Sequence, residues 1–445
     1  MFSYRLYRFV SWLRYTVPRR FTPAGMLVLT LFVCAGALGA EMDQTVAYQL
    51  FALLLALLLV AMIAAAFFHG RFAVRRVLPR FGSVGQALAY HVVVRNETSH
   101  DHPSLETLDE LVDSRPTKEE FIRARRRLVF QMFRKPRLLP ATPLRPLAKG
   151  LTPAALPPLR GHAEVSARLE LTPFQRGALR FKAVVVARAD PLGLVRGFFR
   201  QPLAQTVLIL PKRYPLPDLT LPGSRTYQRG GVSLASAIGE SEEFVALRDY
   251  RPGDPLRHVH WKSWARHGRP IVKEFQDEFF VRHALILDTF ASAGKDEVFE
   301  EAVSVAASFA CTVGTQDSLL DLLFVGPQTV CVTTGRGVGQ AEQALEALAS
   351  VQLSTEKPFG ALEELVMRYA GAVCGCVCVL LDWDEPRRQL VRKLGERGLP
   401  VVVLLVTGDA ERPRAMPGDQ RPEHFHILEP GRIAEGLRRF ASTLS

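Results

Sequence analysis

Cysteine is scarce in this sequence, with six among 445 residues. No two cysteines have the CxxC spacing of zinc sites, which argues against a zinc-based fold. Cys374, Cys376 and Cys378 alternate along one predicted strand, so their side chains share a face, and neighbours on one strand do not readily form a disulfide. The cysteines therefore indicate small, buried apolar side chains in a reducing compartment, with a thiolate metal site as the alternative.

Motifs of nucleotide binding and covalent catalysis are also missing. No GxGxxG or P-loop follows a predicted strand, and the glycine-rich run at 335–339 lacks both the spacing and the lysine. Ser233 and Ser263 lack the sequence context of a nucleophile elbow. The sequence thus gives no support for a nucleotide cofactor or a serine hydrolase, and we expect a protein that is not an enzyme.

Acidic residues are outnumbered, with 44 Asp and Glu against 56 Lys and Arg and a net charge of +12. Such an excess suggests an acidic partner: nucleic acid, anionic lipid or an acidic protein surface. The basic run Arg5–Tyr15 is interleaved with Tyr7, Phe9 and Trp12, whereas the basic cluster at 123–127 has no aromatic pattern. We therefore expect lipid headgroups rather than nucleic acid, with 5–15 lying along the membrane interface as an amphipathic helix.

Two long stretches contain no charged residue: Pro23–Ala40 and Val46–Phe68. Each is long enough to cross a bilayer, and only residues 41–45 separate them, which predicts a transmembrane helical hairpin over 23–68. Arginines flank both outer ends, in the basic segment 1–22 and again after residue 70, whereas the connecting loop has none. This bias predicts that the N- and C-termini are both cytoplasmic. The late start of the first stretch argues against a cleavable signal peptide.

A β-sandwich-like domain is predicted over residues 71–212. Four segments have strand-like alternation with turn residues near their ends: 85–96, 169–176, 179–188 and 207–210. The charged, proline-rich segment 98–159 is predicted to be an insertion, with a helix over Lys118–Phe133. It is interpreted as partly disordered or used for docking, with a solvated surface helix as the alternative.

Residues 281–445 alternate strands with helices, which predicts an open, mostly parallel sheet covered on both sides. The expected strands are 284–288, 319–325, 329–333, 374–381 and 401–406, and the expected helices are 297–313, 340–351, 361–369, 387–397 and 433–443. The segments 374–381 and 401–406 are wholly apolar, as strands buried on both faces of a parallel sheet are.

The most distinctive part of the chain is the segment 213–280, whose centre, Gly239–Glu274, mixes acids, bases, histidines and two tryptophans. It closely resembles the signature of the "domain of unknown function 58" family. The matching residues are Glu243, Phe244, Leu247, Arg248, Tyr250, Pro252, Gly253, Asp254, Arg257, His260, Trp261, Lys262, Ala265 and Arg266. In addition, 173–177 followed by 190–194 resembles the end of the family's β-domain.

The resemblance implies an architecture and a role. Members of this family are membrane-anchored bacterial proteins whose last domain resembles a von Willebrand factor A fold, a Rossmann-like α/β arrangement. They are commonly encoded beside MoxR-type AAA+ ATPases and sometimes beside transglutaminase-like membrane proteins. The expectation is a multi-pass protein of the bacterial inner membrane, a non-enzymatic scaffold or adaptor that works with such an ATPase to assemble or activate a membrane or envelope complex. A structural envelope protein without an ATPase partner is an alternative.

The von Willebrand resemblance also implies a possible cofactor, because such domains often hold a divalent cation through a DxSxS loop and an aspartate from a later loop. Oxygen ligands of this kind suit Mg²⁺. The corresponding candidates here are Asp288, Ser292 and Asp382, while Phe290 replaces the middle serine and Thr355 is a poor match for the distant threonine. With so few oxygen ligands, a fold that retains these polar residues without the ion is the preferred interpretation.

The signature segment admits two chemical interpretations. Asp254, His258 and His260 could form a divalent-metal or general-base site, which would make the protein a metal-dependent enzyme or binding protein. Alternatively, the mixed charges neutralise one another and lock an irregular segment, with Trp261 and Trp264 as its apolar anchor. We favour this structural latch or partner-docking surface, because ion-pair networks produce such charge clusters as readily as active sites do.

Overall fold

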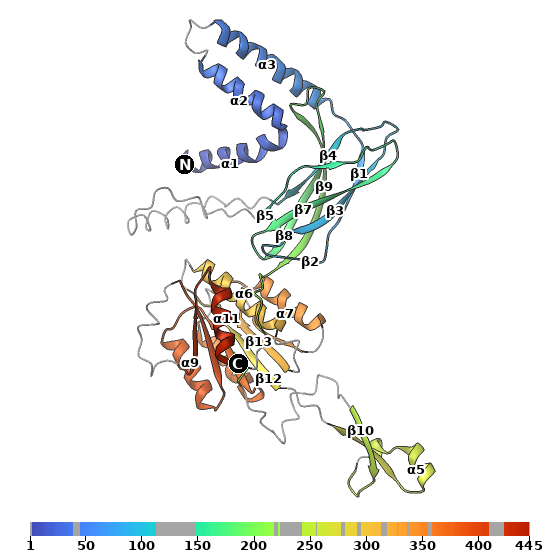
Figure 1. Ribbon diagram of the computed structural model, residues 1–445, viewed down its shortest axis with the longest axis vertical. Helices are drawn as coiled ribbons and strands as arrows, with labels where there is room; N and C mark the ends of the chain where they lie inside the picture. Colours follow the sequence, from blue (N-terminus) through green and yellow to red (C-terminus); the bar gives the residue numbers. More distant parts are fainter. Residues whose placement is uncertain are drawn as a thin grey trace. The chain divides into compact units, whose positions relative to one another are not determined.

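The computed structural model describes residues 2–38, 45–112, 148–217, 221–222, 243–254, 256–276, 281–291, 295–312, 318–326, 328–335, 338–354, 358–408 and 422–444. The chain divides into two compact units, Met1–Lys212 and Arg213–Ser445 (Figure 1). The predicted helix Lys118–Phe133 and the candidate residues Ser292 and Thr355 lie outside the described residues.

The first unit begins with three helices: α1 (Phe2–Arg20), α2 (Pro23–Leu38) and α3 (Thr45–Ala66). The apolar helices α2 and α3 lie side by side, with the rings of Phe32 and Phe51 stacked at 4.7 Å between centroids (Figure 1). By length and composition, the part of α3 over Val46–Ala66 is able to cross a membrane, and α2 is an apolar but shorter helix.

Two sheets form the rest of this unit. A four-stranded sheet has the order β1-β3-β7-β5, and a five-stranded sheet has the order β2-β9-β8-β4-β6. The strands are β1 (Phe72–Val77), β2 (Phe81–Ser83), β3 (Leu88–Asn96), β4 (Leu105–Leu111), β5 (Ala148–Lys149), β6 (Ala154–Leu156), β7 (Glu164–Pro173), β8 (Gly177–Ala189) and β9 (Arg196–Leu210). One apolar core joins both sheets, as the contact of Tyr90 on β3 with Phe181 on β8 shows.

The segment 98–159 contributes strands to both sheets at its two ends. Ala148–Lys149 and Ala154–Leu156 are the strands β5 and β6, and Leu105–Leu111 is the strand β4, paired between β8 and β6. This strand escaped the periodicity argument because two of its buried residues are polar, Thr107 and Asp109. The carboxylate of Asp109 accepts hydrogen bonds from Arg76 on β1, 3.1 Å from Nε, and both side chains are fully buried. A buried ion pair therefore occupies a position where the alternation predicts an apolar side chain.

The α/β part of the second unit contains a six-stranded sheet of order β14-β13-β12-β15-β16-β17. Its strands are β12 (Val281–Leu287), β13 (Ser318–Val325), β14 (Thr329–Thr334), β15 (Gly375–Leu380), β16 (Val401–Val406) and β17 (His424–Leu428). All neighbours are parallel except the β13–β14 hairpin. This confirms the expectation of a mostly parallel sheet in an α/β domain.

Helices cover both faces of this sheet (Figure 1). They are α6 (Asp296–Thr312), α7 (Val338–Ser350), α8 (Gly360–Tyr369), α9 (Glu385–Glu396) and α11 (Ile433–Leu444). Helices α8 and α9 share one core with the even-numbered residues of β12 and β15, among them Cys376 and Cys378. Because strand side chains alternate, the odd-numbered residues point to the opposite face, where α6 lies.

The signature segment forms a hairpin of its own. Strands β10 (Glu243–Asp249) and β11 (Ile271–Gln276) pair antiparallel, and the 3-10 helix η1 (Leu256–His258) and helix α5 (Trp261–His267) connect them. The connection requires left-handed backbone at two glycines, Gly253 in the turn after β10 (φ 107°) and Gly268 after α5 (φ 69°). The burial here is slight, with Val259, Ile271 and Val272 among its buried residues.

Candidate functional site

The first candidate site is a polar cluster at the carboxyl ends of β12 and β15. These strands are parallel neighbours, so their carboxyl ends lie at one edge of the sheet. Asp288 directly follows β12, and its backbone N–H donates to the carbonyl of Val379 on β15 at 2.9 Å. Asp382 follows β15 closely. The topology thus brings together the two aspartates that the sequence singled out, at the edge where open α/β sheets commonly bind ligands.

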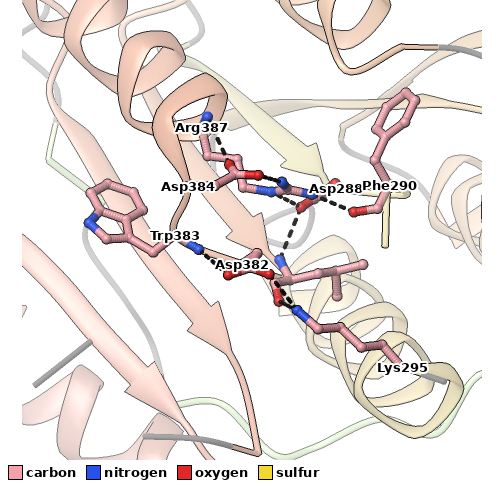
Figure 2. Close-up of polar contacts among 8 residues, drawn as sticks. Asp288, Phe290, Lys295, Asp382, Trp383, Asp384 and Arg387 are labelled. Atoms are coloured by element: carbon pink, nitrogen blue, oxygen red, sulfur yellow. Dashed lines mark hydrogen bonds and ion pairs between the residues drawn. The ribbon is translucent and has the colours of Figure 1, made fainter. Parts of the chain in front are cut away.

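Asp288 is completely buried, and its carboxylate accepts hydrogen bonds from two backbone N–H groups and one arginine (Figure 2). Oδ1 accepts the backbone N–H of Phe290 at 2.9 Å, and Oδ2 accepts the N–H of Leu381 at 3.1 Å. Oδ2 also accepts a hydrogen bond from Nε of Arg387 at 2.6 Å. Burial raises the pKa of Asp288, and the Arg387 guanidinium opposes that rise.

Arg387 lies in the first turn of α9, whose N-cap is Asp384 and whose second residue is Pro386. Its Nη1 donates to Oδ2 of Asp384 at 2.6 Å, its Nη2 donates to the carbonyl of Phe290, and its guanidinium lies over the ring of Phe359, 4.9 Å from the centroid. All three guanidinium nitrogens therefore have acceptors. A planar, delocalised cation suits such a buried multidentate position.

Asp382 has a basic partner as well. Lys295, just before α6, donates to Oδ2 of Asp382 at 2.6 Å and to the carbonyl of Leu381 at 3.1 Å (Figure 2). Partial burial acts to raise the pKa of Asp382, but the hydrogen bonds from Lys295 and from the N–H of Trp383 outweigh it, so the pKa lies below its ordinary value. The carboxylate is thus held ionised by a lysine.

The side-chain oxygen atoms that the structure describes at this strand end do not fit the requirements of a magnesium ion. A Mg²⁺ site needs several oxygen ligands with open lone pairs. Asp288 and Asp382 each bind a basic side chain, and Phe290, two residues after Asp288, has a phenyl ring in place of an oxygen ligand. Within the described ranges, no group of three His, Cys, Asp or Glu side chains has the arrangement of a metal site. The role of Ser292 stays a prediction, because it lies outside those ranges.

The second candidate site is the signature hairpin, where Asp254 is the centre of a charge-paired turn. Its carboxylate accepts hydrogen bonds from Nη1 of Arg248 at 2.7 Å and from Nη2 of Arg248 at 2.8 Å. It also accepts one from the backbone N–H of Arg251 at 2.8 Å. The hydrogen bond from Arg248 lowers the pKa of Asp254 to about 2. The turn Pro252–Gly253 is therefore fixed by a bidentate ion pair, the arrangement that the charge pattern suggested.

The two histidines of the proposed metal cluster bind other neighbours. Nε of Arg257 donates to Nε2 of His258 at 3.1 Å, and Nδ1 of His260 lies 2.6 Å from the hydroxyl of Ser263. Together with the pairing of Asp254 with Arg248, these contacts give no support for a shared metal or general-base site at these residues.

The remaining signature residues form the surface of the hairpin. The rings of Trp261 and Trp264 stack at 5.3 Å between centroids, and 62% of Trp261 is exposed. Leu247 and Leu256 are exposed apolar side chains, and Arg257, Lys262, Ala265 and Arg266 are exposed as well. Tyr250 donates its N–H to the carbonyl of Pro270. Glu243 and Phe244 pair with Gln276 and Phe275 through β10 and β11, and their side chains lie outside the described set.

Sequence reasoning missed Arg387 and Lys295, the two cations of the strand-end cluster. The sequence does show where the helix of Arg387 begins: Asp384-Glu385-Pro386-Arg387 after an apolar strand is an N-cap with proline in the first helical turn. It does not show which side chain Arg387 binds. Lys295 had no comparable signal, because its partner Asp382 lies 87 residues away.

The comparisons with known proteins agree with the signature. Residues 246–370 match the family described as "Protein of unknown function DUF58". The "Uncharacterized protein YeaD" of Bacillus subtilis is 30% identical over 204 residues, which cover 44% of this chain and 48% of that protein. The chain thus spans about half the length of this relative.

Solved structures give only remote likenesses. A β-glucosidase from Listeria innocua has 14% identity and a TM-score of 0.18, covering 32% of this chain and 16% of that one. A cohesin module from Clostridium perfringens has 13% identity and a TM-score of 0.16, covering 32% of this chain and 98% of that one. Similarities at this level support no conclusion about function.

Proposed function

Since this chain belongs to the DUF58 family through residues 246–370, we propose that it is a membrane-anchored, non-enzymatic adaptor that works with a MoxR-type AAA+ ATPase in the assembly or activation of a membrane or envelope complex. In this proposal α2 and α3 are a transmembrane hairpin of the bacterial inner membrane, both termini are cytoplasmic, and the C-terminal domain is of the von Willebrand factor A type. A transglutaminase-like membrane protein is a further proposed partner.

Two observations support the anchor. Val46–Ala66 has a mean hydropathy of 2.6, and α2, beside it, has no charged residue. Arg19 and Arg20 end α1 just before α2, and Arg71, Arg75 and Arg76 follow α3. Arginines at both outer ends of an apolar pair favour a cytoplasmic side for both ends.

The six-stranded sheet supports the proposal for the C-terminal domain. A central set of parallel strands between two helical layers, with one antiparallel strand at the edge, is compatible with a von Willebrand factor A-type arrangement. At the sheet edge where such domains hold a cation, the carboxylates are bound by Arg387 and Lys295. In this proposal the domain therefore binds its partner without a metal ion at this edge.

The observation that carries the docking proposal is the exposed surface of the signature hairpin. We call it the tryptophan platform and define it as the exposed residues Leu247, Leu256, Arg257, Trp261, Lys262 and Arg266 together with the half-buried Trp264. Residues 243–276 contain seven basic and four acidic side chains, so the hairpin carries a net positive charge. Exposed tryptophan and arginine are the residues that most often dominate protein interfaces. The platform therefore fits a partner surface that is apolar at its centre and acidic at its rim.

The experiment is a binding measurement between the detergent-solubilised full chain and a purified MoxR-type AAA+ ATPase. The double change Trp261→Ala and Leu256→Ala should weaken binding at least tenfold, because both side chains are exposed and their loss removes interface area without removing core contacts. Phe174→Ala, an exposed aromatic residue of the β-domain, is the matched control. Unchanged affinity in the folded double variant would contradict the docking role.

A further inference from the structure

The turn between β8 and β9, residues 190–195, is rigid and is built around one buried carboxylate. Asp190 accepts the backbone N–H groups of Leu192 at 2.9 Å, Leu194 at 2.7 Å and Val195 at 2.7 Å. Gly193 has a φ of 68°, a conformation that favours glycine. Leu192, at the tip, is 46% exposed, and Pro191 beside it is exposed too. The turn thus presents an apolar tip on a fixed backbone.

This turn is bound to the start of α2. The backbone N–H of Thr22 donates to the carbonyl of Leu194 at 3.0 Å, and its hydroxyl donates to the carbonyl of Gly193. Phe21 and Val195 form an isolated antiparallel bridge. A Cβ on Gly25 would lie 1.9 Å from the carbonyl oxygen of Leu194, so the helix and the turn are in direct backbone contact.

The same strand end also contacts the end of α3. Ala61 and Ala65 are buried against Leu194 and Val195. A Cβ on Gly197 would lie 2.5 Å from the carbonyl oxygen of Ala65. The turn therefore lies beside the points where the first apolar helix begins and the second one ends.

Two arginine side chains lie close to the ends of these elements. The guanidinium of Arg188, at the end of β8, lies 5.0 Å from the ring centroid of Phe68, just after α3. The guanidinium of Arg20, at the end of α1, lies 5.0 Å from the ring centroid of Phe198 on β9. Basic side chains near the ends of α1 and β8, together with the exposed Leu192 of the turn, give the charge and apolarity that anionic lipid headgroups and the upper acyl chains accept.

From these contacts we infer that the β8–β9 turn is a third membrane attachment, in which Leu192 enters the lipid interface beside the transmembrane hairpin. The partner is the surface of an anionic bilayer. This inference rests on the proposed anchor, because the position of α2 and α3 in the bilayer brings the turn to the headgroup level. The attachment fixes the β-domain to the membrane through the Asp190 turn as well as through the covalent chain.

The test measures quenching of a tryptophan by lipids brominated near the glycerol end of their acyl chains. The full chain carries Trp12→Phe, so that the tryptophan of α1 does not contribute, and is reconstituted into phosphatidylglycerol-containing vesicles. Leu192→Trp reports on the turn. Phe174→Trp is the control, because Phe174 is exposed at the other end of β8, whose 13 residues span about 40 Å.

The emission added by Leu192→Trp should fall by roughly half in the brominated vesicles, whereas that added by Phe174→Trp should stay unchanged. Vesicle flotation is measured on the same samples. Protein that floats while both added tryptophans are equally unquenched would overturn the attachment of the turn and leave the anchor intact. Protein that does not float would overturn both the anchor and the attachment.

Discussion

Nε of Arg387 lies 2.6 Å from Oδ2 of Asp288, a buried pair in which an arginine binds the aspartate that a divalent cation would need. Asp288 has no exposed surface, and the side chain of Arg387 is 6% exposed. The pair joins the end of β12 to the first turn of α9, two elements 99 residues apart. It therefore fixes the edge of the sheet as much as it neutralises a charge.

Replacing Arg387 with methionine should destabilise the protein strongly. Removal of one partner leaves the other buried without a counter-charge, which costs about 3–5 kcal/mol. The measurement is urea denaturation of the detergent-solubilised chain at pH 8. Lys393→Met is the control, because Lys393 lies on the same helix in an exposed pair with Glu363 and should cost about 0–1 kcal/mol. Equal losses for the two variants would refute the structural importance of the Arg387–Asp288 pair.

Magnesium should not bind at the end of β12. Both carboxylates there are bound by basic side chains, so cation binding would require breaking two ion pairs. In calorimetric titration of the chain with Mg²⁺, we expect no heat that depends on Asp288. A binding heat that disappears in Asp288→Ala would restore the metal hypothesis.

The Arg248–Asp254 pair of the signature hairpin should lose its contribution to stability only as the pH falls below about 4. The hydrogen bond from Arg248 lowers the pKa of Asp254 to about 2 from 3.8. A carboxyl group whose pKa is lower in the folded state than in the unfolded state stabilises the folded state at pH values above its unfolded pKa. This contribution is lost as the pH falls through the folded-state pKa. The window of loss is therefore between about pH 4 and pH 2.

Carbon-detected NMR of ¹³C-aspartate protein, with the resonance assigned through Asp254→Asn, measures this pKa. In Arg248→Gln the pKa should rise toward the ordinary aspartate value, whereas Arg269→Gln should leave it in place, because Arg269 binds Asp249 instead. A normal pKa for Asp254 in the unmodified chain would mean that the ion pair does not persist in solution.

Gly25→Ala should separate α2 from the β-domain. The added methyl group would lie 1.9 Å from the backbone oxygen of Leu194, which cannot move aside as a flexible side chain would, and overpacking costs about 1–3 kcal/mol. Gly36→Ala on the same helix is the control. Its added methyl group would lie 3.1 Å from a ring atom of Phe51, which is a side chain and not backbone. Thermal melting of both variants in detergent should show the larger loss for Gly25→Ala; the reverse order would contradict the close contact.

Much of the α/β domain could be predicted, because strands such as Val401–Val406 are uniformly apolar and buried on both faces. By contrast, β17 (His424–Leu428) was missed. It is an edge strand whose two histidines and partial burial give no apolar run. The periodicity of hydrophobic residues and the composition identify strands and helices that are buried throughout. They do not identify an edge strand with one polar face.

The chemistry of the candidate sites was harder to predict, for a reason that is also physical. The resemblance to von Willebrand factor A domains singled out Asp288 and Asp382, but whether a carboxylate binds a metal or an arginine depends on partners far along the chain. The pairing of Arg248 with Asp254 is local, six residues apart, and the charge pattern predicted pairing of this kind. Long-range ion pairs need the fold; short-range ones are visible in the sequence.

The central proposal is that α2 and α3 hold this chain in the inner membrane with its large C-terminal part in the cytoplasm. Protease treatment of intact spheroplasts and of inverted membrane vesicles, followed by detection of a C-terminal tag, tests it most directly. We predict that the tagged part survives in spheroplasts and is digested in inverted vesicles. Digestion in intact spheroplasts would contradict the proposal, because it would place the α/β domain outside the cell.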